Sequence, residues 1–113
     1  MAGPEADNPA RGWFADAGGE TVNSQAVLVR VAGRVQGVGF RAWTQREAQH
    51  LGLRGWVRNE PDGSVSALIA GPNEAVAGML KRFQQGPSGA HVKSVETSPA
   101  DKSDALADFD ITG

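Results

Sequence analysis

Apolar and polar positions along the chain divide it into a polar amino-terminal stretch followed by alternating strands and helices. Residues 26–32 have the β-branched content of a largely buried strand, and residues 41–51 repeat their apolar positions with a helical period. Gly52 follows at the position where helices commonly stop. One face of this first helix carries the side chains that we expect to be buried: Phe40, Thr44, Ala48 and Leu51.

A hairpin and a second helix come next. Residues 53–59 predict a second strand, Pro61-Asp62-Gly63 is a strong turn signal, and residues 64–70 alternate as a third strand. The second and third strands should therefore run antiparallel. Gly71-Pro72 opens the second helix, because proline suits the first helical position, and Gly86-Pro87 ends it. The expected buried stripe of this helix is Val76, Leu80 and Phe83.

The carboxyl-terminal part completes a β-α-β-β-α-β order. Residues 91–97 predict a fourth strand, and a polar loop leads to a short final strand at residues 108–112. This order is typical of the ferredoxin-like arrangement, an α+β sandwich with an antiparallel-rich sheet and two helices on one face. One domain is expected at residues 25–113.

The first 24 residues are rich in Gly, Pro, Ala, Asp and Asn and have no apolar period, which indicates a mobile tail. Trp13-Phe14 is its one apolar point. A docking role for this pair on the domain or on a neighbouring molecule is the alternative, and a flexible tail is the favoured interpretation.

Composition narrows the function classes. The formal net charge is -2, so no basic surface for nucleic acid or an anionic membrane is indicated. There is no cysteine and there are two histidines, His50 and His91, without a carboxylate cluster at ligand spacing, so we expect no metal and no cofactor. No apolar run approaches the roughly 20 residues of a membrane span, and no secretory signal pattern begins the chain, so a cytoplasmic protein is expected.

The glycine-rich stretch at residues 33–41 is the most informative motif. Gly33, Gly37 and Gly39 lie close together between a strand and a helix, a spacing that lets successive backbone N–H groups converge on an anion. The helix N-terminus adds further donors. Arg41 adjoins this loop, and its guanidinium suits phosphate geometry. A solvated surface arginine is the plainer interpretation, but the combination favours a phosphate site.

Two known phosphate-binding motifs could be compared with this glycine-rich stretch, and the surrounding sequence excludes both. Residues 37–42 match the dinucleotide fingerprint G-x-G-x-x-G/A, and Glu60 even follows near a strand end. A nucleotide fold, however, needs a parallel third strand, which the hairpin at residues 61–63 forbids. A Walker A loop is excluded because no Gly-Lys-Ser/Thr ends the run.

Asn59 is the candidate partner of this loop. A right-handed βαβ crossover places the carboxyl ends of both parallel strands at one edge of the sheet, so Arg41 and Asn59 should converge on one crevice. An amide can accept a hydrogen bond from a water molecule and donate one to it, and can so orient that water toward a bound phosphorus. Asn is also common in turns, and from residue type alone a turn-forming role in residues 59–63 is preferred.

The two motifs taken together resemble a known family. Their letters are GRVQGVGFR at residues 33–41 and LGLRGWVRN at residues 51–59, followed by Asp62-Gly63, and the chain is similar to the acylphosphatase family over essentially residues 25–113. The resemblance implies hydrolysis of carboxyl–phosphate bonds, with Arg41 binding phosphate and Asn59 orienting the attacking water. It also implies a cradle of backbone amides from Gln36, Gly37, Val38, Gly39 and Phe40. Some relatives carry another small residue in place of Gly39, a departure that leaves the amide intact.

We expect a monomer that acts on a small acyl phosphate, with no nucleic acid or membrane partner. The alternative function is a non-catalytic ferredoxin-like module that binds an anion or a nucleic acid. A sheet of this kind that binds RNA needs surface aromatics and basic charge, whereas this chain has no tyrosine and a net negative charge. Similar domains also occur at the amino end of a larger carbamoyl-transferring maturation protein, and a stand-alone enzyme is the simpler expectation. A last hypothesis places the Gly113 carboxylate against Arg41, provided that the final strand lies parallel beside the second.

Overall fold

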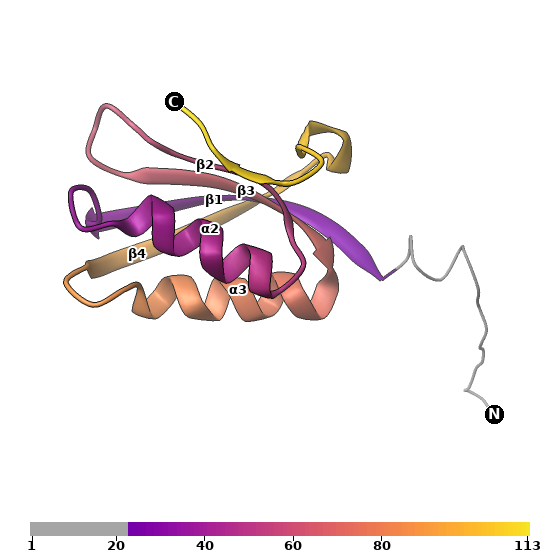
Figure 1. Cartoon of the computed structure of the whole chain (residues 1–113), viewed down its shortest axis with the longest axis horizontal. Helices are drawn as coiled ribbons and strands as arrows, with labels where there is room; N and C mark the ends of the chain where they lie inside the picture. Colours follow the sequence, from indigo (N-terminus) through magenta and orange to yellow (C-terminus); the bar gives the residue numbers. More distant parts are fainter. Residues whose placement is uncertain (1–22) are drawn as a thin grey trace.

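The computed structural model describes residues 23–113, so the expected tail, with Trp13-Phe14, lies outside the described residues up to residue 22 and stays a prediction. The described elements follow the predicted order (Figure 1). They are β1 (Ser24–Arg34), α2 (Phe40–His50), β2 (Arg54–Asn59), β3 (Val65–Pro72), α3 (Asn73–Gln85), β4 (His91–Ala100), a 3-10 turn (Lys102–Asp104) and β5 (Phe109–Ile111).

The strands form one five-stranded sheet in the order β4-β1-β3-β2-β5. β3 is antiparallel to both β1 and β2, and β5 lies parallel beside β2. Figure 1 shows α2 and α3 side by side on the same face of this sheet. The ferredoxin-like α+β fold predicted from the element order is therefore confirmed.

The core lies between the sheet and the two helices, because alternate strand residues point to that side. Val29 is paired with Ala67 and Val31 with Val65, and all four side chains are fully buried. The helices contribute a second layer of buried side chains: Phe40, Thr44 and Ala48 from α2, and Val76, Met79 and Phe83 from α3.

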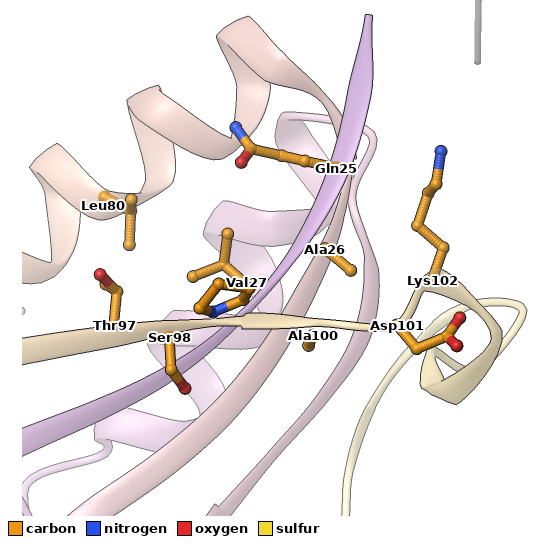
Figure 2. A pocket seen from close by; sticks show the side chains of 10 residues that line it. Gln25, Ala26, Val27, Leu80, Thr97, Ser98, Ala100, Asp101 and Lys102 are labelled. Carbon is orange, nitrogen blue, oxygen red and sulfur yellow. The ribbon is translucent and has the colours of Figure 1, made fainter. Parts of the chain in front are cut away.

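Two details of α3 differ from the prediction. Pro72 ends β3 and caps the helix with extended dihedral angles (φ -56, ψ 145), so the helix begins at Asn73. Met79 is fully buried, whereas Leu80 is only partly buried at the border of the core. The stripe therefore follows an i, i+3, i+7 spacing, and Leu80 lines the hollow between β1, β4 and α3 shown in Figure 2.

The full burial of Met79 and the partial burial of Leu80 predict unequal costs for truncating the two side chains. Met79→Ala should lower the free energy of unfolding by about 2–4 kcal/mol, because it leaves a cavity in a fully buried position. Leu80→Ala should cost about 1 kcal/mol, because its side chain already contacts solvent. Urea unfolding of both variants measures the difference, and an equal or reversed order would contradict the assigned packing of α3.

Candidate active site

A pocket of about 240 Å³ lies where the β1–α2 loop meets the end of β2. It brings together Arg41 from the first turn of α2 and Asn59 from the last position of β2. Of the six residues predicted to hold phosphate, Gly37, Gly39, Phe40 and Arg41 line this pocket, whereas Gln36 and Val38 do not. The complete lining is Val35, Gly37, Gly39, Phe40, Arg41, Ala42, Asn59 and Ile111.

Two glycines give the loop its shape. Gly37 and Gly39 have φ angles of 77° and 78°, in the left-handed region that residues with a Cβ rarely adopt. Gly39 is also the N-cap of α2, and its carbonyl accepts a hydrogen bond from the Trp43 amide at 3.0 Å. The loop thus turns twice within three residues and delivers the start of α2 directly to the pocket.

The backbone donors of the loop are unused within the described part of the chain. Over residues 23–113, no amide from Gln36 to Phe40 donates to another protein group. α2 has neither a side-chain N-cap nor an acidic residue in its first turn. These donors and the positive end of the helix dipole form a site that favours an anion.

Arg41 adds the one full positive charge among the lining residues. In the described part of the chain, ion pairs within 4.0 Å join Arg30 to Asp62, Arg58 to Glu60, and Arg82 to Glu47, and none of them includes Arg41. The hypothesis of an Arg41 pair with the Gly113 carboxylate is therefore not supported. β5 does lie parallel beside β2 as that hypothesis required, but Gly113 packs against the side chain of Arg58.

Asn59 does not form the turn that follows it. The amide and hydroxyl of Ser64 donate to Asp62 Oδ1 at 2.9 Å and 2.6 Å, so Asp62 is the residue that shapes the turn. Asn59 lies in β2, paired with Val65, and its side chain makes no hydrogen bond within residues 23–113. The turn-forming role preferred from residue type is therefore wrong, and the Asn59 amide lies in the wall of the pocket.

The turn between β2 and β3 carries two carboxylates whose pKa values are lowered. A hydrogen bond from Arg58 is the main cause at Glu60, and a hydrogen bond from the Ser64 hydroxyl is the main cause at Asp62. The Arg30 guanidinium also contacts Asp62 and donates to the Ser64 hydroxyl at 3.3 Å. Glu60 is thus held ionised mainly by Arg58 of β2, and Asp62 by Ser64 of the turn and Arg30 of β1.

Two contributions to the site were missed by sequence reasoning. Ile111 of β5 lines the pocket and is 40% exposed, an apolar side chain beside Arg41 and Asn59. Gln36 was considered only for its backbone, whereas its side chain donates to Glu60 O at 2.9 Å and Ser64 O at 2.8 Å. Neither could be found from local pattern, because both contacts join segments that are distant in the sequence.

A larger hollow of about 850 Å³ lies elsewhere, between β1, β4 and α3 (Figure 2). Its charged side chains are Asp101 and Lys102, which bring opposite charges. Several of the residues that line it are small or apolar: Ala26, Val27, Leu80, Pro99 and Ala100. Size alone would favour this hollow, but the donor set around Arg41 makes the smaller pocket the candidate active site.

Within residues 23–113, no cluster brings three or more His, Cys, Asp or Glu side chains together in a way that could hold a metal ion. No helix in the same residues has the length and apolar character needed to cross a membrane.

Fold and pocket together define a class of small α+β proteins with a backbone anion site beside an arginine and an asparagine. The acylphosphatase family model matches residues 27–111, and the chain belongs to the acylphosphatase family. The acylphosphatase of Rhizobium etli is 57% identical over 91 residues, covering 80% of this chain and 97% of that protein. The acylphosphatase of Rhizobium meliloti is 58% identical over 92 residues, covering 81% and 97%.

Solved structures agree with this assignment. An acylphosphatase from Coxiella burnetii superposes with a TM-score of 0.78 at 30% identity, over 82% of this chain and 97% of that one. The Bacillus subtilis acylphosphatase gives a TM-score of 0.74 at 33% identity, over 78% and 98%. Full-length HypF, in a phosphate- and nucleotide-bound form, gives 0.70 at 24% identity but over only 12% of its own chain, a likeness of fold alone.

The lowered pKa of Asp62 predicts a contribution to stability that disappears in acid. A carboxylate whose folded pKa lies below its usual 3.8 stabilises the fold above that value, and the contribution is lost as the pH falls through the folded pKa. Between about pH 5 and pH 2, the wild type should therefore lose more unfolding free energy than Asp62→Asn. Urea unfolding across this range measures both slopes, and parallel curves would count against the assigned hydrogen bonds of Asp62.

Proposed function

We propose that the protein hydrolyses the carboxyl–phosphate bond of small acyl phosphates and releases a carboxylate and inorganic phosphate. One observation carries the proposal: Gly37, Gly39 and Phe40, whose backbone amides donate to no group among residues 23–113, line one pocket together with Arg41 and Asn59. Membership of the acylphosphatase family supports the same reaction.

The phosphoryl group would be held at the start of α2. The oxygens of the phosphoryl group would accept hydrogen bonds from the backbone amides of the loop and from Arg41. The planar guanidinium of Arg41 can form two parallel hydrogen bonds. The negative charge of the group also lies at the positive end of the helix dipole. Gln36 and Val38 do not line the pocket, so in this proposal their part is limited to their backbone amides.

Asn59 would hold the attacking water on the wall opposite the loop. The amide oxygen accepts a hydrogen bond from the water, which leaves a lone pair of the water oxygen directed at phosphorus. As the P–O bond to water forms, the bond to the acyl oxygen breaks, and the carboxylate leaves with the electron pair. The protons of the water remain on the phosphate product, so atoms and charge balance.

This reaction needs neither a strong base nor a phosphoenzyme. A carboxylate leaving group has a pKa of about 4 and departs without protonation. The transition state is loose and spreads charge over the phosphoryl oxygens, so catalysis depends on positioning and electrostatic stabilisation. We therefore propose hydrolysis without a metal or other cofactor. We also propose that the protein acts as a monomer in the cytoplasm and has no nucleic acid partner.

The test of the function is phosphate release from benzoyl phosphate with a chelator present throughout. We expect turnover that chelator does not change, because the proposed groups are all supplied by the protein. Absence of turnover by the folded wild-type protein would overturn the proposed reaction. Activity that is lost on adding chelator would instead overturn only its independence from metal.

Two alanine variants should separate binding from turnover. Arg41→Ala should weaken inhibition by inorganic phosphate by about 10- to 100-fold, since it removes a charged hydrogen-bond donor worth about 1.5–3 kcal/mol. Asn59→Ala should lower kcat by about 10²–10³ with little change in phosphate inhibition. Steady-state kinetics with benzoyl phosphate measures both effects.

Matched controls exist in the same chain. Arg46→Ala removes an exposed arginine from the same helix, and Asn73→Ala removes an exposed asparagine at the start of α3. Both should keep kcat and phosphate inhibition within about twofold of wild type, as surface changes usually do. Unchanged phosphate inhibition in Arg41→Ala, or wild-type kcat in Asn59→Ala, would refute the corresponding role.

A further inference from the structure

The side chain of Gln36 connects the phosphate loop to the hairpin that carries Asn59. Its Nε2 donates to Glu60 O at 2.9 Å and to Ser64 O at 2.8 Å, so both protons of the amide are used. These two carbonyls lie at opposite ends of the turn between β2 and β3. The side chain therefore bridges the turn from the loop side, and it is partly buried in doing so.

The two acceptors belong to a rigid part of the hairpin. The Glu60 amide donates to Ser64 O at 2.9 Å, and the Gly63 amide donates to Glu60 O at 3.1 Å. Asp62 fixes Ser64 from within the turn, and Arg30 on β1 holds both of these residues from the side. The hydrogen bonds of Gln36 to these carbonyls therefore attach the loop to a rigid turn.

Asn59 directly precedes Glu60, and Gln36 directly precedes Gly37, which lines the pocket. One side chain therefore bridges the two halves of the site: the loop amides on one side and the Asn59 amide on the other. Loss of the bridge would leave each half intact but free to shift relative to the other. A displacement of about 1 Å between reacting groups can cost a 10²-fold loss of rate.

We propose that Gln36 is a positioning residue that fixes the distance from the bound phosphoryl group to the water held by Asn59. The inference rests on the proposed hydrolysis of acyl phosphates. It assigns to the Gln36 side chain an effect on turnover that is separate from phosphate binding, because neither the loop amides nor Arg41 depend on its donors.

The first test is Gln36→Met, which keeps length and volume but removes both donors. With benzoyl phosphate at pH 7, kcat per folded molecule should fall by about 10- to 100-fold. The inhibition constant of inorganic phosphate should stay within about threefold. Gln45→Met is the matched control, because Gln45 also donates through Nε2 to a backbone carbonyl, Phe109 O at 3.0 Å, but lies outside the lining of the pocket; its kcat should remain near wild type.

The second test is Gln36→Glu, whose activity should depend on pH in a way that stability alone does not produce. As a carboxylate it faces two carbonyl oxygens without a proton to donate, which disfavours the charged form and raises its pKa above about 4.3. Once protonated, it regains one O–H donor. The ratio of kcat in Gln36→Glu to kcat in Gln36→Met should therefore rise several-fold as the pH is lowered from about 7.5 to 5.

The outcomes are distinguishable. Wild-type protein that does not hydrolyse benzoyl phosphate would remove the proposed function, and the inference with it. Active wild type together with an unchanged kcat per folded molecule in Gln36→Met would overturn the inference alone. The same holds if kcat and phosphate inhibition weaken in parallel, or if Gln36→Glu and Gln36→Met share one pH profile. Circular dichroism at each pH gives the folded fraction.

Discussion

The position of β3 between β1 and β2 is the constraint on which the site depends. β3 is antiparallel to both neighbours, so β1 and β2 are parallel to each other and end at the same edge of the sheet. The loop after β1 and the last residue of β2 meet there, although a whole strand separates the two. The buried pairs Val29–Ala67 and Val31–Val65 hold the register, because a slip of one residue would turn the core side of β3 outward.

Without a bound anion the pocket is electrostatically unfavourable, and the β1–β3–β2 pairing must offset this cost. Several backbone donors of the loop have no acceptor among residues 23–113, and a cation in the first turn of a helix is disfavoured by about 0.3–1 kcal/mol. Such an arrangement relaxes unless the surrounding structure over-determines it. Two glycines in the left-handed region permit the loop conformation, but they also make it easy to leave. Rigidity must therefore come from outside the loop, and the hydrogen-bonded hairpin beside it supplies a fixed surface.

Strands and helices could be predicted where the spacing of apolar residues and the flanking turn or helix-ending residues indicate the same element. The hairpin around Pro61-Asp62-Gly63 and the first helix up to Gly52 are of this kind. Helical periodicity allowed Leu80 as well as Met79 in the stripe of α3, and only packing against the sheet selects Met79. The pairing of loop and β2 end followed from topology, whereas the identity of the turn-forming residue did not. The bonds of Gln36 span 24 and 28 positions, a separation at which local pattern carries no signal.

β5 adds a wall of a different kind to the pocket. It is three residues long, pairs with β2, and brings Ile111 to the lining while leaving 40% of that side chain exposed. The β1–β3–β2 pairing places Arg41, Asn59 and the loop, whereas Ile111 comes from a strand that is added at the edge of the sheet, beside β2. Substitutions at the edge of the sheet can therefore remodel one side of the pocket without disturbing the groups proposed to act on phosphorus. The fold in this way separates the groups proposed to act on phosphorus from an apolar wall of the pocket that an edge strand supplies.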